Sequence, residues 1–199
     1  MITWMSRSVS SLFITQEIIS TEDREVYEYS FEILFSTVLS LIAVAVIAIL
    51  SKTVYYTVLY LAGFIPLRLF AGGYHAKNHF RCFIALMIVY FAFTFTLFII
   101  PVEYFIIVII MGSLLSTLLV FLVAPSEEKK RPFTRKEAVR FRRVSRISII
   151  VYVTLIGILA AVIPDIRVAF SISMGVLTVC ISLLVNYIKC RKLETKITR

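Results

Sequence analysis

Charged residues are scarce in this sequence of 199 residues: Asp, Glu, Lys and Arg make up 17% of it, whereas hydrophobic residues make up 60%. An average soluble domain has about 25% charged and about 45–50% apolar residues. This shortage excludes an ordinary soluble domain and predicts helices that cross a membrane. Nothing in the sequence suggests a second domain, so we expect a single membrane-embedded domain over residues 1–199.

Paired cysteines are lacking as well. The three cysteines, Cys82, Cys180 and Cys190, show no CxxC or other paired spacing, which argues against a disulfide framework. Cys180 lies in an apolar run and is expected to behave as a small buried hydrophobic residue. Cys190 stands between two basic residues and is expected to be an incidental thiol or a palmitoylation site. Only Cys82 has neighbours that would activate a thiol.

A secretory leader is not expected either, because the first long apolar run begins near Phe31 and no basic leader with a small-residue cleavage site precedes it. Instead, residues 1–28 begin with apolar side chains at helical spacing. These are Ile2, Met5, Val9, Leu12, Phe13 and Ile19. The pattern predicts an amphipathic helix that lies in the membrane interface, with packing on the rest of the protein as the alternative.

Six apolar runs follow, and most of them approach the roughly 20 residues that a membrane span needs. The runs cover about 31–50, 53–67, 83–100, 104–123, 147–163 and 168–188. The second is short, and Gly63 and Pro66 weaken its end, so it is expected to be tilted, kinked or partly re-entrant. We therefore predict an all-α polytopic membrane protein with about six transmembrane helices and an N-terminal amphipathic interfacial helix.

Most of the basic residues behind the net charge of +9 gather in two stretches, within 125–146 and 189–199. Positive charge is retained on the cytoplasmic side of membranes, where it also contacts anionic lipid head groups. We therefore expect cytoplasmic N- and C-termini, four spans over 29–124, a basic cytoplasmic loop over 125–146, two spans over 147–188 and a basic tail. Because topology explains the basic clusters, nucleic acid is not an expected partner.

The segment 68–82, RLFAGGYHAKNHFRC, is a polar break in this apolar chain, and the predicted topology places it on the cytoplasmic side. Ionisable residues near a bilayer indicate function by default. Two adjacent glycines are expected to end the preceding helix, and Asn78 or His79 to begin the next, which puts Cys82 in a first helical turn. A helix N-terminus favours the thiolate, and its free amides suit an oxyanion.

Two histidines compete as the base for Cys82. His79 is three residues away and would share its helix face, whereas His75 requires the chain to fold back, so spacing slightly favours His79 without deciding. A second interpretation joins His75, His79 and Cys82 as metal ligands, although no HExxH glutamate accompanies them. A third gives these side chains no chemical role. We expect no cofactor and no metal.

The pattern of Arg68, Gly73, His75 and Cys82 resembles the accessory gene regulator B family, the membrane cysteine endopeptidases of Gram-positive peptide quorum sensing. The resemblance extends to the amphipathic N-terminal region, to YSFE at 29–32, and to the Ala-Pro and basic run after the fourth span. It therefore covers nearly the whole chain. Where family members often have glycine, this chain has Ser30.

The resemblance implies that His75 and Cys82 are the catalytic pair, which reverses the preference from spacing. It implies an AgrD-like propeptide as substrate, cleaved through a Cys82 thioester and then cyclised to a thiolactone or lactone in a bacterial cell membrane. Arg68 and Gly73 are possible supporting residues: Arg68 would hold a substrate carboxylate or fix the loop, with a topology-setting arginine as the alternative. Glu32 is a candidate to orient His75, as the third member of a triad does, with a simple interfacial carboxylate as the alternative. A homodimer agrees with the resemblance, but no motif requires one.

The basic residues Arg140, Arg142 and Arg143 are candidates for electrostatic contact with the acidic C-terminal part of such a propeptide. Two other functions remain as alternatives. One is a non-enzymatic membrane protein that binds or transports peptides, which would need more intramembrane charge than the last two spans offer. The other is a metal-dependent membrane protease.

Overall fold

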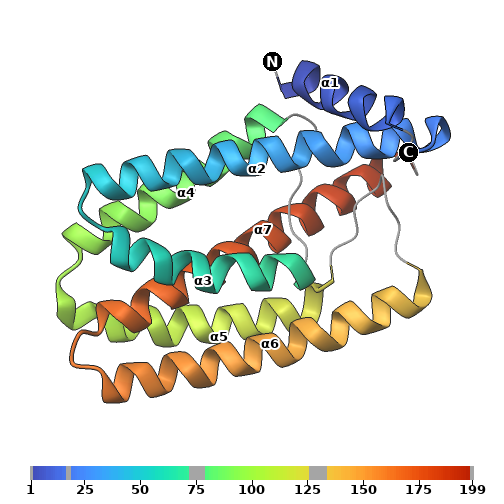
Figure 1. Cartoon of the computed structure of the whole chain (residues 1–199). Coiled ribbons are helices and arrows are strands. Elements are labelled where there is room, and N and C mark those ends of the chain that lie inside the picture. Colours follow the sequence, from blue (N-terminus) through green and yellow to red (C-terminus); the bar gives the residue numbers. More distant parts are fainter. Residues whose placement is uncertain (1, 17–18, 72–78, 126–133, 198–199) are drawn as a thin grey trace. The chain divides into compact units, whose positions relative to one another are not determined.

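The computed structural model describes residues 2–16, 19–71, 79–125 and 134–197, and all regular structure in these ranges is helical (Figure 1). Two 3-10 turns, Thr21–Asp23 and Val102–Tyr104, precede α2 and α5. The α-helices are α1 (Ile2–Thr15), α2 (Arg24–Leu50), α3 (Val54–Ala71), α4 (His79–Ile99), α5 (Phe105–Val123), α6 (Arg135–Val162) and α7 (Arg167–Ile197). The predicted all-α class is confirmed.

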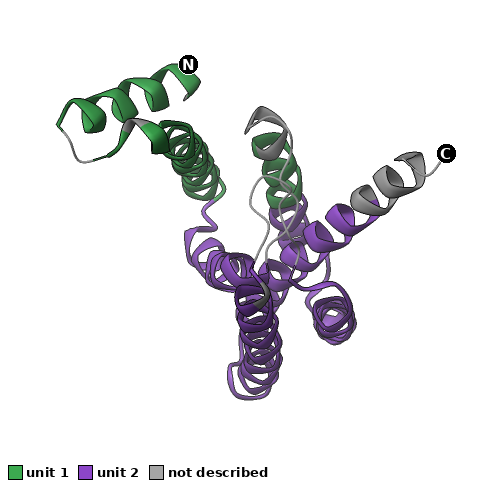
Figure 2. Ribbon diagram, turned by 90° about the vertical axis from the view of Figure 1, so that its right-hand side faces the viewer, with its two compact units in different colours: residues 1–51, 76–91 green, residues 52–75, 92–199 purple. Residues whose placement is uncertain are grey.

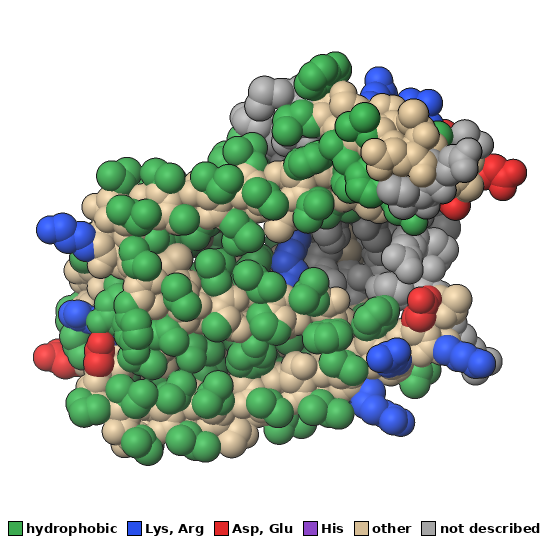
Figure 3. Space-filling model, viewed as in Figure 1, with side chains coloured by type: hydrophobic (Ala, Val, Ile, Leu, Met, Phe, Trp, Pro, Cys, Tyr) green, Lys and Arg blue, Asp and Glu red, His purple; other side chains and the backbone are tan. Residues whose placement is uncertain are grey.

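Five of these helices are long and apolar enough to cross a membrane, and the apolar part of α4, Phe83–Ile99, is somewhat shorter. Large hydrophobic side chains remain exposed along the outer faces of the helices, including Leu34, Ile42 and Ile49 of α2. In the face shown in Figure 3, hydrophobic side chains cover most of the surface and most charged ones gather near helix ends. Such a surface is stable only against lipid or another apolar partner, as expected of a polytopic membrane protein.

Two of the helices are longer at their N-terminal ends than the apolar runs indicate. α6 starts at Arg135, so part of the segment expected as a basic loop is helical. Its first turn carries a capping box, in which the Thr134 hydroxyl accepts from the Glu137 amide and the Glu137 carboxylate accepts from the Thr134 amide. α2 likewise begins at Arg24, ahead of its apolar run.

The second span forms one continuous helix that is long enough to cross a membrane, which differs from the partly re-entrant course that was one of the expectations. The expected tilt or kink stays a prediction. α3 continues through Pro66 and ends at Ala71, immediately before the two glycines that were expected to stop it. A proline inside a helix removes one intrahelical hydrogen bond. Neighbouring helices in a membrane protein can supply the missing donor, so a proline does not have to end a span.

The chain contacts divide into two compact units, coloured separately in Figure 2, and the boundary at residues 91 and 92 falls inside α4. Unit 1 contains α1, α2 and the first part of α4. Figure 2 looks nearly along α2 and shows α1 from the side, so the axes of these two helices are not parallel. If α2 spans the bilayer, α1 is inclined to it, which is compatible with an interfacial helix.

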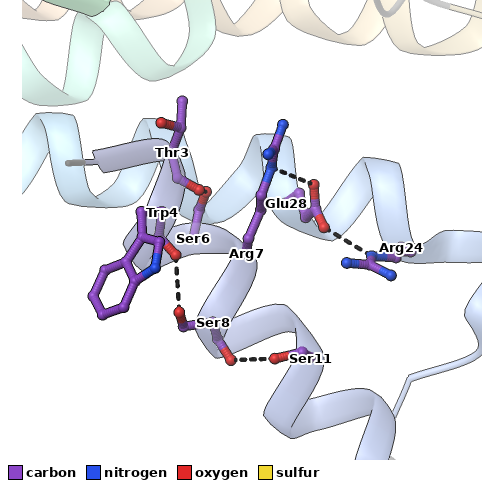
Figure 4. A network of polar contacts seen from close by, with 8 residues as sticks. All are labelled: Thr3, Trp4, Ser6, Arg7, Ser8, Ser11, Arg24 and Glu28. Carbon is purple, nitrogen blue, oxygen red and sulfur yellow. Dashed lines mark hydrogen bonds and ion pairs between the residues drawn. The ribbon is translucent and has the colours of Figure 1, made fainter.

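The contact between α1 and α2 is partly polar. Ser6 and Ser10 of α1 are fully buried, and Arg7 pairs with Glu28 of α2 at 3.7 Å (Figure 4). Phe13 and Phe31 add an aromatic contact, with ring centroids 5.6 Å apart.

The opposite face of α1 is exposed, with Trp4 71% and Leu12 61% accessible. Its hydroxyl groups donate to main-chain carbonyls of α1 itself: Ser8 to Trp4, Ser11 to Ser8 and Thr15 to Ser11. Because these hydrogen bonds are internal, the face can enter the interface without leaving those donors unsatisfied.

Unit 2 contains α3, the second part of α4, α5, α6 and α7, and α7 is its central helix. Two thirds of the most apolar stretch of α7 is buried (67%), against at most 33% in the other long spans. Four fully buried rings fill the interior: Tyr60 stacks on Phe93 at 4.6 Å, Phe93 on Phe170 at 6.4 Å, and Phe170 on Phe105 at 4.4 Å. They join α3, α4, α5 and α7.

Two glycines allow the backbones of α3 and α7 to approach closely. A Cβ atom on Gly63 would lie 2.5 Å from the Ile172 carbonyl oxygen, and one on Gly175 would collide with the Tyr60 carbonyl oxygen. Small residues at such crossings are typical of helix packing in membranes. The contact fixes α3 against the most buried helix of the unit.

Candidate active site

The last two turns of α3 carry Arg68, the one predicted site residue on that helix. Its guanidinium lies half-buried beside α7, where Nη1 donates to the Ser182 hydroxyl at 3.3 Å. The guanidinium carbon also lies 5.5 Å from the centre of the Phe64 ring, one turn earlier on α3, as in a cation–π contact. Arg68 is thus held at the contact between α3 and α7 by a hydroxyl group and beside an aromatic ring.

Ser182 was not among the residues singled out in the sequence. Its hydroxyl donates to the Val179 carbonyl of its own helix at 2.8 Å, which leaves its oxygen lone pairs to accept from Arg68. One turn earlier, Thr178 accepts from Tyr60 of α3 at 3.0 Å. The signal that identifies this polar face is the four-residue spacing of Thr178, Ser182 and Asn186 within an apolar span.

The start of α4 agrees with the prediction for Cys82. The helix begins at His79, so Cys82 is its fourth residue and lies in the first helical turn. The side chains of 79–82 lie outside the described part of the structure, as does the whole of 72–78, which includes Gly73 and His75. The pairing of His75 with Cys82 therefore stays a prediction, as does the competing role of His79.

Glu32, the residue proposed to orient His75, is half-buried on α2 in unit 1. A half-buried carboxylate near the start of a span is compatible with a supporting role, and its relation to His75 stays a prediction.

The three arginines proposed to meet the acidic part of a propeptide lie on the first half of α6. Arg140, Arg142 and Arg143 are all exposed. The next arginine along, Arg146, instead serves the packing of the bundle: its Nη2 donates to the Phe121 carbonyl of α5 at 3.2 Å. The three candidate arginines are therefore accessible to solvent, whereas Arg146 makes a structural contact.

Cys180 is fully buried, as its apolar surroundings predicted, and its thiol donates to the Ser116 carbonyl at 3.6 Å. Within the described ranges, no three His, Cys, Asp or Glu side chains are grouped as metal ligands. The side chains of His75, His79 and Cys82 lie outside the described part of the structure, so a metal site made of these three residues stays an alternative interpretation.

Comparison with curated proteins and with solved structures gave no match. The family model described as accessory gene regulator B matches residues 5–183, which is most of the chain. The match includes α1, the segment 68–82, and the basic first half of α6. The chain therefore belongs to the accessory gene regulator B family, membrane proteins that process the autoinducing peptide of a quorum-sensing system.

Proposed function

We propose that this protein is a membrane cysteine endopeptidase that cleaves an AgrD-like propeptide and promotes cyclisation of the signal peptide. The observation that carries the proposal is the position of Cys82 in the first turn of α4, which begins at His79. The positive end of the helix dipole lowers the pKa of a thiol and so favours the nucleophilic thiolate. Membership of the family supports the same chemistry.

The first step is attack of the Cys82 thiolate on the carbonyl carbon of the scissile peptide bond, with His75 as the base that removes the thiol proton. Main-chain amides at the start of α4 are suited to stabilise the oxyanion. The C–N bond then breaks, His75 returns the proton to the leaving amine, and the C-terminal fragment departs. The N-terminal part of the propeptide remains attached to Cys82 as a thioester.

The second step exchanges one thioester for another. A cysteine thiol inside the bound peptide gives its proton to His75 and attacks the carbonyl carbon, which closes a thiolactone ring and releases the Cys82 thiolate; a serine hydroxyl in its place would give a lactone. Because the exchange is nearly neutral in energy, hydrolysis by water is the competing reaction. A site bounded by apolar helices and lipid favours cyclisation by excluding water.

Arg68 is proposed as a substrate-binding residue for this reaction. Arg68 lies in the last turns of α3, just before the segment that leads to Cys82, and the planar donors of a guanidinium suit a carboxylate or a peptide carbonyl. Gly73 and Glu32 are proposed as supporting residues, through the loop and through His75 respectively. The exposed Arg140, Arg142 and Arg143 are proposed to attract the acidic C-terminal part of the propeptide.

The proposed topology places both termini and the active site on the cytoplasmic side of a bacterial membrane. In unit 2, the C-terminal end of α5 lies beside the basic first half of α6, because Arg146 contacts Phe121. The C-terminal end of α3 lies at the same end, because the start of α3 contacts Asp165, which follows the end of α6. The opposite end contains Asp165, which accepts from Tyr56 at the start of α3. Positive charge therefore accumulates at one end, which the positive-inside rule assigns to the cytoplasm.

The experiment is incubation of the purified protein in lipid nanodiscs with its cognate propeptide, followed by mass spectrometry of the products. We expect cleavage and a cyclic product, both abolished by Cys82→Ala and retained in Cys180→Ala, the matched control at a buried cysteine. His75→Ala should abolish cleavage, whereas His79→Ala should retain it. Cleavage that survives Cys82→Ala and stops on addition of a chelator would support a metal-dependent protease instead.

A further inference from the structure

A proline in α3 deprives one main-chain carbonyl of its helical partner, and a tyrosine of α6 takes its place. In an α-helix each carbonyl accepts from the amide four residues later. For Ala62 that residue is Pro66, which has no N–H group. The Tyr152 hydroxyl donates to the Ala62 carbonyl oxygen at 2.7 Å.

This hydrogen bond explains why α3 remains one helix through the proline. A carbonyl without a partner is strongly unfavourable in apolar surroundings, so an undonated Ala62 would favour local opening of the helix. Tyr152 is half-buried, and apart from its hydroxyl its side chain is apolar, which suits a donor supplied across a helix contact. The short distance indicates a well-formed hydrogen bond.

A second side chain of α6 donates to a carbonyl at a helix end. Phe121 lies in the last turn of α5, where carbonyls have no partner within the helix, and Arg146 of α6 donates to its carbonyl at 3.2 Å. α6 therefore supplies side-chain donors to two carbonyls without helical partners, one on α3 at a proline and one at the end of α5.

The Ala62 carbonyl, which accepts from Tyr152, lies close in the sequence to Arg68 and to the proposed site. Pro66 is two residues before Arg68, and the last turn of α3 leads into the segment that ends at Cys82. Gly63 packs against α7 just before the proline, and Ser182 of α7 holds Arg68 just after it. Pro66 lies between these two attachments to α7, and the Tyr152 hydroxyl of α6 supplies the hydrogen bond that Pro66 cannot, at Ala62 next to Gly63.

We propose that Tyr152 is a positioning residue for peptide processing, which acts through the Ala62 carbonyl to fix the last turn of α3 and the direction of Arg68. The proposal rests on the proposed function. In this proposal the Tyr152 hydroxyl replaces the amide donor that Pro66 lacks. The role of Tyr152 therefore depends on the presence of Pro66.

The test is a double-mutant cycle between these two positions. Tyr152→Phe removes the hydroxyl, and we expect the cleavage rate to fall by about five- to tenfold, the size of one lost hydrogen bond. Pro66→Ala supplies an amide that can pair with Ala62. In the Pro66→Ala background, Tyr152→Phe should therefore have no effect on cleavage.

A second measurement does not depend on activity. Hydrogen exchange of the amides at 67–71, followed in lipid nanodiscs, should be faster in Tyr152→Phe than in the wild type and should return to the starting rate in the double variant. Tyr56→Phe is the matched control, because it removes a tyrosine hydrogen bond at the opposite end of α3. It should leave the exchange of 67–71 unchanged.

Two results would overturn the proposal: wild-type cleavage and exchange in Tyr152→Phe, or an equal loss of cleavage with and without Pro66. The second result would assign Tyr152 to packing alone. Failure of the proposed function gives a different pattern, because the wild-type protein would then leave the propeptide intact while the exchange of 67–71 still responded to Tyr152→Phe.

Discussion

The guanidinium of Arg68 donates to the hydroxyl of Ser182 at 3.3 Å, across the contact between α3 and α7. It joins the end of the helix that leads into the polar segment to the most buried helix of unit 2. A charged residue in such a place is held by polar side chains, and the Ser182 hydroxyl is one such partner of Arg68.

Ser182→Ala should reduce propeptide cleavage by about fivefold, because a hydrogen bond to a charged group contributes about 1.5–3 kcal/mol and this one is long. Ser171→Ala is the matched control on the same helix, since the Ser171 hydroxyl donates only to the Arg167 carbonyl of α7 itself. Cleavage rates measured with the propeptide in excess would check the comparison. Equal rates in the two variants would argue against a role for Ser182 in positioning Arg68.

Gly175→Ala should destabilise the protein strongly, because the added Cβ meets the main chain of α3, which cannot move aside as a side chain can. Overpacking of this kind costs about 1–3 kcal/mol or more. Gly157→Ala is the control, since nothing lies within 4 Å of its Cβ position and alanine favours a helix. Thermal unfolding in detergent should give a lower Tm for Gly175→Ala and an unchanged or higher Tm for Gly157→Ala. The reverse order would contradict the close packing of α3 and α7.

The helices and their membrane character could be predicted from the sequence, because apolar runs of about 20 residues have few other stable structures. The start of α4 at His79 could also be predicted, since two glycines precede it. The extent of α6 could not be predicted from the apolar pattern. Its first turns are basic, and they are helical through a capping box at Thr134 and Glu137.

The contacts around the candidate site were less accessible from sequence. Pro66 weakens a helix on local grounds, and only the tertiary contact with Tyr152 explains why α3 continues past it. Ser182 is one serine among several in an apolar span, and its pairing with Arg68 depends on how α3 and α7 are aligned. Long-range contacts of this kind leave only a weak spacing signal in a single sequence.

Neutralising the exposed basic side chains of α6 should weaken processing without preventing insertion. For the combined substitution Arg140→Gln, Arg142→Gln and Arg143→Gln, we expect about tenfold lower cleavage at low salt and a smaller difference at high salt, because screening already weakens the wild-type attraction. The triple lysine variant retains the charge and should remain close to the wild type. Cleavage at several salt concentrations, with membrane levels measured in parallel, provides the comparison. An equal, salt-independent loss of cleavage in the glutamine and lysine variants would indicate that these arginines support the structure and do not act through their charge.

The exposed face of α1 should lie in the membrane interface. Trp4 is on this face and is the only tryptophan in the chain, so its fluorescence reports α1 alone. In lipid nanodiscs we expect a blue-shifted emission that is quenched more strongly by lipids labelled near the head group than by lipids labelled near the end of the acyl chain. Leu12→Glu should weaken this quenching. Emission typical of water, with no quenching by either lipid, would place α1 outside the membrane.

The central claim is that Cys82 carries the peptide as a thioester, and trapping that intermediate tests it most directly. A propeptide whose internal cysteine is replaced by alanine can be cleaved but cannot form the thiolactone, so the acyl-enzyme should accumulate. Intact mass spectrometry should then show a gain equal to the propeptide mass minus the released C-terminal fragment, absent from Cys82→Ala and present in Cys180→Ala. Cleavage without this adduct, or an adduct that persists in Cys82→Ala, would contradict the claim.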